Sequence, residues 1–197
     1  YKDEAIFSKK ARELTNYQGN ALSVICAYNV EAVPQNTVHG ISDEEFIRGK
    51  APMTKEEVRT ISLSKLKLQE DSVCYDVGAG TGSVSIEMSL GAHQGEVYAI
   101  EKKDEAVELL KENKKKFAAD NLTIVSGLAP EAMRNLPAPT HAFIGGSSGN
   151  LKEIVKLLVE KNKSIRIVIN CITLETVSEA LEAAKEFAFD TNEIVQL

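Results

Sequence analysis

The residues best suited to chemistry form a short run in which an apolar stretch ends in an acid and three alternating glycines. The run reads Cys74-Tyr75-Asp76-Val77-Gly78-Ala79-Gly80-Thr81-Gly82. Glycines here permit a tight turn and let backbone N–H groups approach a ligand, and a helix expected to follow adds a positive potential. The third glycine comes one residue earlier than in the G-x-G-x-x-G pattern of dinucleotide sites, so the spacing favours S-adenosylmethionine over NAD.

A second acid, Glu101, ends the next apolar run and supports a ligand that carries a ribose. It lies about twenty residues beyond the glycines, where a carboxylate can accept hydrogen bonds from both ribose hydroxyls. Each feature alone has a simpler explanation, in which Asp76 and Glu101 are solvated acids at strand ends and the glycines form a plain turn. The combination favours cofactor binding.

Two further segments follow expected strands and would lie at the same edge of a sheet. The segment from Ser126 to Glu131 stands where an adenine would rest, although a strand-to-helix turn with Pro130 at the first helical position is the simpler explanation. The segment from Gly145 to Gly149 stands where methyltransferases place residues that face the substrate. A flexible linker is the alternative, but connections inside compact domains are rarely so rich in glycine.

A parallel sheet would bring these segments together, and the pattern of the chain predicts one. From residue 54 onward, short β-branched runs alternate with charged helical segments, which is typical of the α/β class. We expect the strands in the order 3-2-1-4-5, with later strands added at the far edge. The expected strands are Val73 to Val77, Glu96 to Glu101, Leu122 to Ser126, His141 to Gly145, Ile165 to Asn170 and Glu193 to Leu197, and the expected helices are Thr54 to Leu68, Ser83 to Gly91, Lys103 to Ala119, Glu131 to Leu136, Asn150 to Asn162 and Glu175 to Phe187.

Two of these elements depend on local signals. Thr54 followed by Glu57 has the spacing of a capping box, which predicts that a helix begins at Thr54. The stretch from Val84 to Leu90 alternates like a strand, but a parallel sheet needs a crossover after the glycine turn. We therefore predict a helix there.

The first part of the chain differs in character from the rest. It contains a charged helix-like segment, a lone apolar run from Leu22 to Ala27, and a loop rich in Pro, Asn, Gly and His. A segment this short cannot fold alone. We expect residues 1–39 to be an arm or the tail of a preceding domain, and residues 40–197 to be a separate domain.

Composition and residue spacing exclude several other classes of protein. The 23 basic and 29 acidic residues give a net charge of -6, which disfavours nucleic acid as a partner. No apolar run is long enough to span a membrane, so a cytoplasmic protein is expected. His39, His93 and His141 lack the spacing of metal ligands, so no metal site is predicted. Cys26, Cys74 and Cys171 each lie in an apolar run and are expected to be buried thiols.

Five separated motifs, in order, resemble the CbiT-type precorrin methyltransferases of cobalamin biosynthesis. They are Gly40 to Phe46, Pro52 to Arg59, Asp76 to Glu87, Ile144 to Ser147 and Asn170 to Thr176. The resemblance implies a class I S-adenosylmethionine-dependent methyltransferase fold, Rossmann-like with three αβα layers, whose final antiparallel strand would follow Leu197. It also implies methylation of carbon 15 of a precorrin, with loss of carbon dioxide from the acetate group on carbon 12.

The resemblance assigns the site residues to two groups. The expected contacts with S-adenosylmethionine are Thr54, Asp76, Gly78, Ala79, Gly80, Thr81, Gly82, Glu101 and Ala129. The candidates on the substrate side are Gly145, Gly146, Ser147, Asn170, Thr173 and Glu175. Family members suggest a tetramer. The stretches Leu22 to Ile25 and Asn29 to Ala32 are similar to the end of the CbiE-type carbon-5 methyltransferase, which implies a CbiE-type domain or subunit as a partner.

Two other functions stay open on the sequence. The chain could methylate another acceptor, such as a protein or RNA, or it could be a cofactor-binding subunit that assembles with a CbiE-type partner. A precorrin carries many carboxylates, which a local basic surface would attract. Arg48, Lys50, Lys55 and Arg59 could supply that surface or could be an ordinary solvated helix face.

Overall fold

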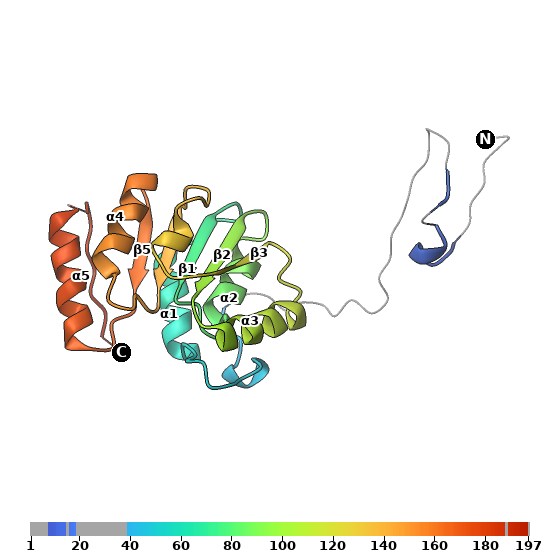
Figure 1. Ribbon diagram of the computed structural model, residues 1–197, viewed down its shortest axis with the longest axis horizontal. Coiled ribbons are helices and arrows are strands. Elements are labelled where there is room, and N and C mark those ends of the chain that lie inside the picture. The colour runs from blue at the N-terminus through green and yellow to red at the C-terminus, as the bar shows by residue number, and fades with distance from the viewer. Residues whose placement is uncertain (1–7, 15, 19–38, 188, 197) are drawn as a thin grey trace. The chain divides into compact units, whose positions relative to one another are not determined.

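The computed structural model describes residues 8–14, 16–18, 39–187 and 189–196, and the chain divides into two compact units, 1–36 and 37–197 (Figure 1). The described part of the first unit contains one short 3-10 helix, Ala11–Glu13. Cys26 and the apolar run from Leu22 to Ala27 lie outside the described residues. The expected boundary after residue 39 stays a prediction.

The second unit is built on one parallel sheet. Its five strands are β1 (Val73–Val77), β2 (Glu96–Glu101), β3 (Leu122–Ser126), β4 (His141–Ile144) and β5 (Arg166–Ile169). Their order is β3-β2-β1-β4-β5, and every neighbouring pair is parallel. The predicted α/β class and strand order are confirmed. The order reverses between β1 and β4, and ligands of open α/β sheets bind outside the carboxyl ends of the strands at such a point.

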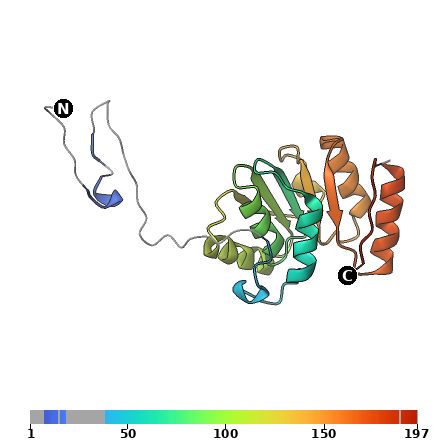
Figure 2. The same cartoon turned by 180° about the vertical axis from the view of Figure 1, so that it is seen from behind.

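Helices cover both faces of the sheet (Figures 1 and 2). Helices α1 (Glu56–Leu66), α2 (Ser83–Gly91) and α3 (Asp104–Lys116) contribute to one apolar core, and α4 (Leu151–Lys161) and α5 (Leu174–Glu186) contribute to the other. Successive side chains of a strand point to opposite faces. Cys74 therefore belongs to the first core and Tyr75 to the second, and Asp76 faces the side of α2.

Two predicted elements differ from the structure, and one element that the sequence left ambiguous is confirmed. The predicted strand Glu193 to Leu197 is wrong, because residues 193–196 are exposed and irregular, and Glu193 pairs with Lys65 of α1. The predicted helix Glu131 to Leu136 is only a 3-10 turn, Glu131–Met133. Residues 83–91 do form a helix, as the crossover argument predicted.

The capping box at Thr54 is also wrong. Helix α1 begins at Glu56 with Lys55 as its N-cap, and no side chain caps it. The Thr54 carbonyl oxygen instead accepts a hydrogen bond from the Arg59 side chain, at 2.7 Å. Another short 3-10 helix, Asp43–Glu45, precedes α1. None of the helices that the structure describes is long and apolar enough to cross a membrane.

Candidate active site

The glycine loop between β1 and α2 is shaped by close contacts with other parts of the chain. Gly78 has φ +77°, and a Cβ there would lie 2.6 Å from the Gly146 carbonyl oxygen. Gly80 has φ +56°, and a Cβ there would lie 2.5 Å from the Pro52 carbonyl oxygen. Both distances are too short for real Cβ contacts, and both φ values favour glycine. These glycines therefore let three backbone segments meet at one point.

The backbone N–H groups of the loop are occupied by acceptors of the protein itself. Within Gly78 to Gly82, two N–H groups donate to the Ile100 carbonyl, at 3.0 and 3.2 Å, and one donates to the Glu101 carboxylate. The other two donate to the carbonyls of Pro52 and Ala79, at 3.4 and 2.8 Å. The expectation that these N–H groups approach a ligand does not hold in this structure. Side chains of the loop are better placed to bind one.

Asp76 is the buried acid of the loop. The residue is 1% exposed, and its carboxylate accepts a hydrogen bond from the hydroxyl of Ser85, in the first turn of α2. Burial raises the pKa of Asp76 from 3.8 to about 7, against the Ser85 hydrogen bonds, which lower it, and with a smaller contribution from the charge of Glu101. Asp76 is thus held at the N-terminus of α2, where an acid is favourable.

Two buried polar atoms at the loop have no hydrogen-bond partner. They are Asp76 Oδ1 and Thr81 Oγ1, and no other buried side-chain oxygen or nitrogen within the described ranges is unpartnered. Buried polar atoms in native proteins nearly always have a partner, so an exception needs an explanation. Both atoms can accept a hydrogen bond, which makes them candidates to bind a donor group of a ligand.

Glu101 ends β2 and is 8% exposed. One carboxylate oxygen accepts the Gly80 N–H at 2.9 Å, and the other accepts the N–H groups of Lys102 and Lys103 at 2.9 and 3.0 Å. A carboxylate offers about four acceptor positions, so about one remains for a ligand. This geometry fits one ribose hydroxyl better than the two that the sequence suggested.

The strap, residues 40–54, packs over the glycine loop and is held by a buried ion pair. Arg59 and Glu87 are both 0% exposed, and Arg59 Nε donates to Glu87 at 2.5 Å. Glu87 also accepts the N–H groups of Gly40 and Ile41 at 3.0 and 3.2 Å, and Arg59 pairs with Asp43 at 3.1 Å. The network fixes the strap to α1 and α2.

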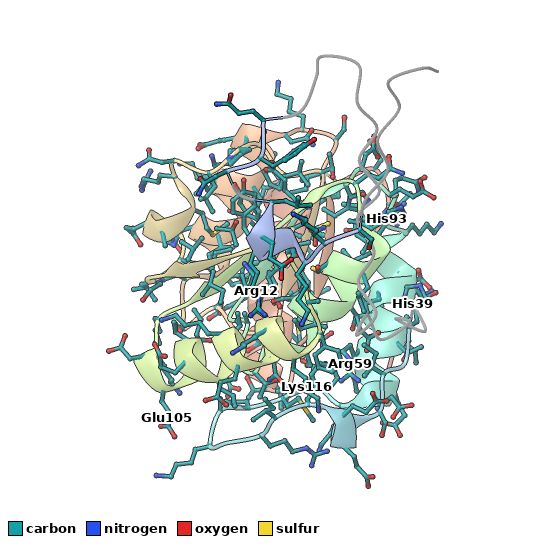
Figure 3. The ribbon with its side chains drawn as sticks, turned by 90° about the vertical axis from the view of Figure 1, so that its right-hand side faces the viewer. Arg12, His39, Arg59, His93, Glu105 and Lys116 are labelled. Carbon is teal, nitrogen blue, oxygen red and sulfur yellow. The ribbon has the colours of Figure 1, made fainter. Side chains whose placement is uncertain are left out.

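The buried pair changes the expected role of the basic residues. Arg59 is not on the surface, so it is unavailable to substrate carboxylates. Lys55 and Arg48 both lie within 4.0 Å of the Asp43 carboxylate. Figure 3 labels Arg59 and Lys116, which come from α1 and α3 and both donate to carbonyls of the strap. Arg59 therefore serves the packing of the strap, whereas Arg48, Lys50 and Lys55 are exposed, so a basic surface for substrate carboxylates stays a prediction for these three.

The β4 and β5 side of the carboxyl edge is open. A hollow of about 270 Å³ lies between the loops that follow these strands. It is lined by Ile144, Gly145, Gly146, Ser147, Ser148, Gly149, Leu151, Ile169, Asn170, Ile172, Thr173 and Thr176. A Cβ at Gly146 would meet nothing within 4 Å. Five of the six substrate-side candidates therefore line one cavity, and Glu175, on the exposed first turn of α5, does not.

The segment after β3 gives a mixed outcome. Ala129 is 6% exposed and belongs to the second core, and its carbonyl accepts the Asn150 amide at 3.0 Å. Its neighbour Leu128 is 43% exposed. Leu128 is thus better placed than the Ala129 side chain to contact a flat ring at this edge, and the sequence analysis did not select it.

Other sites have less support. A hollow of about 390 Å³ is lined by Lys111, Lys114, Lys115, Ala118, Asp120 and Ile124, and it contains none of the predicted residues. In the described part of the chain, no three His, Cys, Asp or Glu side chains could hold a metal ion together. Cys74 is buried as expected, but Cys171 is half-buried, because it lies just past the end of β5.

Comparisons with known proteins identify the family of this architecture. A family model described as a precorrin methyltransferase domain matches residues 45–194. A relative from Sulfurisphaera tokodaii, named probable cobalt-precorrin-6B C(15)-methyltransferase (decarboxylating), is 44% identical over 79% of this chain and 82% of its own length.

Solved structures agree with the family match. A precorrin-6Y C5,15-methyltransferase from Geobacter metallireducens has a TM-score of 0.72 and 41% identity, over 78% of this chain and 81% of that chain. A precorrin-8w decarboxylase from Methanobacterium thermoautotrophicum has a TM-score of 0.72 and 36% identity, over 77% and 83%. A SAM-dependent O-methyltransferase from Thermotoga maritima, 18% identical with a TM-score of 0.59 over 68% of this chain and 51% of that chain, shares the class I methyltransferase fold.

Proposed function

The chain belongs to the precorrin methyltransferase family, and we propose that it methylates carbon 15 of a precorrin with S-adenosylmethionine as the methyl donor. In the same proposal, the acetate side chain on carbon 12 loses its carboxyl group as carbon dioxide. One observation carries the assignment of the site. The Gly78 and Gly146 backbones touch at the switch point of the sheet, so the unpartnered acceptors and the open hollow lie on either side of one contact.

The residues on the β1 and β2 side fit S-adenosylmethionine, which would supply an electrophilic methyl group on a sulfonium. Asp76 Oδ1 would accept a hydrogen bond from its ammonium group, and Glu101 would accept one from a ribose hydroxyl. Thr81 Oγ1 offers a further acceptor. Three further parts of the chain complete the proposed contacts: Thr54, the segment around Ala129, and the loop from Gly78 to Gly82. The loop would contribute van der Waals contact, because its N–H groups already have acceptors.

The protein's contribution to methyl transfer is to position two reactants. A carbon of the macrocycle attacks the methyl group in line, a carbon–carbon bond forms, and the electron pair of the breaking carbon–sulfur bond stays on sulfur. Holding both reactants in this geometry lowers the barrier by up to about 7 to 11 kcal/mol. Gly145, Gly146 and Ser147 line the hollow, and the open space at Gly146 is where a flat ring would lie.

Decarboxylation needs an electron sink, and the conjugated macrocycle supplies it. The bond between the acetate methylene and its carboxylate breaks, carbon dioxide leaves, and the electron pair passes into the ring. The methylene carbon then takes up one proton, and the ring gives up the proton that methylation displaces, so no net proton is consumed. Because the macrocycle itself accepts the electrons, the role of the protein is to orient it and to supply a suitable electrostatic environment.

The partners of the protein belong to the same proposal. We expect a cytoplasmic homo-oligomer that works next to a CbiE-type carbon-5 methyltransferase domain or subunit. One support is that the Geobacter relative is named for methylation at both carbon 5 and carbon 15. Light scattering coupled to size exclusion, with and without a CbiE-type protein, measures both assemblies. A monomer that does not bind the CbiE-type protein would contradict the proposed assembly.

The mass of the product tests the reaction directly. Purified protein is incubated with cobalt-precorrin-6B and S-adenosylmethionine labelled in its methyl group. We expect a product that gains one labelled methyl group and loses one carbon dioxide. Methylation without loss of carbon dioxide would contradict the decarboxylating assignment, and no methylation of any precorrin would favour another acceptor or an assembly role.

A further inference from the structure

One polar residue that lines the hollow, Asn170, has its side-chain amide held by Ser62, which no pattern in the sequence singled out. Asn170 follows β5 and lines the hollow, and its backbone N–H donates to the Ile144 carbonyl at 3.0 Å. Ser62 of α1 is 4% exposed. Its Oγ lies 2.7 Å from the Val58 carbonyl oxygen and 3.2 Å from the side-chain amide of Asn170, where Oδ1 is placed.

The single proton of the Ser62 hydroxyl determines how the amide is oriented. The Val58 carbonyl is the closer acceptor and lies four residues earlier on the helix, which is a common bond for a helical serine. With the proton on that bond, Ser62 Oγ can only accept from Asn170. The O and N of an amide have the same shape and are assigned from the hydrogen-bond network. If the O and N of the Asn170 amide are exchanged, its NH₂ donates to Ser62 Oγ, and the Ser62 hydroxyl donates to the Val58 carbonyl. The three groups then each have a hydrogen-bond partner.

This orientation turns the Asn170 carbonyl oxygen away from Ser62. In the part of the chain that the structure describes, the atom of this amide that faces away from Ser62 makes no hydrogen bond. The hollow would therefore contain a fixed, neutral acceptor. A polycarboxylate tetrapyrrole offers ionised carboxylates, which only accept, and ring N–H groups, which donate. A carbonyl oxygen of Asn170 can therefore accept a hydrogen bond from a ring N–H group but not from a carboxylate.

We propose that Ser62 is a positioning residue that holds the Asn170 amide with its carbonyl oxygen toward the hollow, where it accepts a hydrogen bond from a ring N–H of the substrate. The inference rests on the proposed function and adds a recognition element for the macrocycle itself. Ser62 acts only through Asn170.

The test measures substrate binding as well as turnover. The affinity for cobalt-precorrin-6B in the presence of S-adenosylhomocysteine is measured from the absorption of the tetrapyrrole, and kcat is measured separately. We expect Ser62→Ala to weaken binding about three- to tenfold, as for one hydrogen bond. Asn170→Leu should weaken it at least as much. Ser64→Ala removes an exposed hydroxyl from the same helix and is the matched control.

The double variant tests whether Ser62 acts through Asn170. We expect Ser62→Ala combined with Asn170→Leu to bind the precorrin as Asn170→Leu does alone, because coupled residues are not additive. Melting temperature and S-adenosylhomocysteine affinity should match the Ser64→Ala control. Additive losses, or equal losses of stability and of both affinities, would show a merely structural role and overturn the inference.

Asn170→Asp tests the direction of the amide. An aspartate keeps an acceptor toward the hollow, so this variant should bind the precorrin better than Asn170→Leu. If the amide NH₂ instead faced a substrate carboxylate, aspartate would repel it and bind worse than leucine, which overturns the inference. Precorrin binding is measured without turnover. A wild-type protein that binds the precorrin but does not methylate it would contradict the proposed function, and the affinities of Asn170→Asp and Asn170→Leu would still decide the inference.

Discussion

The two halves of the carboxyl edge use glycine for opposite purposes. On the β1 and β2 side, a Cβ at Gly78 or Gly80 would lie 2.6 or 2.5 Å from a backbone oxygen of another segment. On the β4 and β5 side, a Cβ at Gly145 would lie 2.9 Å from the Phe143 ring, but one at Gly146 or Gly149 would meet nothing within 4 Å. The first side is closed by its own chain, and the second is open.

The difference also separates the polar groups of the two sides. Asp76 and Glu101 are nearly buried and are fixed by hydrogen bonds from the protein. Ile172, by contrast, is 92% exposed beside the hollow. Buried, preorganised acceptors suit a small ligand that is the same in every reaction cycle, and an open, partly apolar surface suits a large flat substrate. Glycine content alone would not have distinguished them.

The largest effect is expected from adding a methyl group at the contact between the two sides. Gly78→Ala places a Cβ against the Gly146 backbone and strains a positive φ, which costs about 2 to 5 kcal/mol in total. The melting temperature should fall by roughly 5 to 20 °C, with loss of cofactor binding. Gly146→Ala adds the same methyl group from the other side of this contact, into open space, and should melt like the wild type. Equal stability of the two variants would contradict the comparison.

The next effect concerns the open side. Gly146→Leu places a large side chain at the hollow from a Cβ position that meets nothing within 4 Å. Methyl transfer to the precorrin should fall at least about a hundredfold, because steric exclusion acts on the substrate. S-adenosylhomocysteine affinity should stay within about 1 kcal/mol of the wild-type value. Labelled methyl transfer, calorimetry and melting temperature are measured on one preparation. Transfer at the wild-type rate would place the substrate elsewhere.

A smaller effect is expected from Glu101 on the closed side. Glu101→Gln removes the charge and turns an NH₂ group toward backbone N–H donors, so S-adenosylhomocysteine affinity should fall by about 1.5 to 3 kcal/mol, or about 10- to 150-fold. Calorimetry measures the dissociation constant. Glu105→Gln, in the exposed first turn of α3, the helix that follows β2, is the control (Figure 3). Equal dissociation constants for the two variants would put the ribose elsewhere.

The sequence predicted the sheet well because its order follows from local signals. A glycine turn after a buried strand of a parallel sheet requires a crossover helix. This argument correctly predicted a helix at residues 83–91, although their alternating pattern suggested a strand. The same reasoning placed most of the substrate-side candidates around one hollow. The loop after β4 could be placed at the carboxyl edge of the sheet from the predicted strand order alone.

The contacts between distant segments could not be predicted in the same way. Arg59 stands in a charged helix and looked like a surface cation, but Glu87 and the strap bury it completely. The capping box failed although its spacing is right, because α1 begins two residues later than predicted, with Lys55 as its N-cap. The role of Pro52 over Gly80 has no local signal, since it depends on a segment 28 residues earlier in the chain.

The smallest effect at neutral pH is expected from the titration of Asp76 on the closed side, which changes the stability of the folded protein with pH. Burial raises its pKa from 3.8 to about 7 in the folded protein. Between these values the folded state binds more protons than the unfolded state, so this group makes the protein less stable as pH rises through the window. The cofactor-free wild type should therefore lose more melting temperature from about pH 5 to 7 than Asp76→Asn, which does not titrate there.

Cofactor binding should show the opposite slope. The ionised form of Asp76 is the better acceptor for an ammonium group, which stays largely charged below its own pKa of about 7.7 to 8.0. S-adenosylhomocysteine affinity should therefore rise up to about tenfold per pH unit below pH 7 and level off above it, with only about a twofold effect at pH 7 itself. Calorimetry between about pH 5.5 and 7.5 measures this slope, and Asp76→Asn should bind more weakly with no slope. A wild-type slope that Asp76→Asn retains would assign the titration to another group and remove Asp76 from the ammonium site.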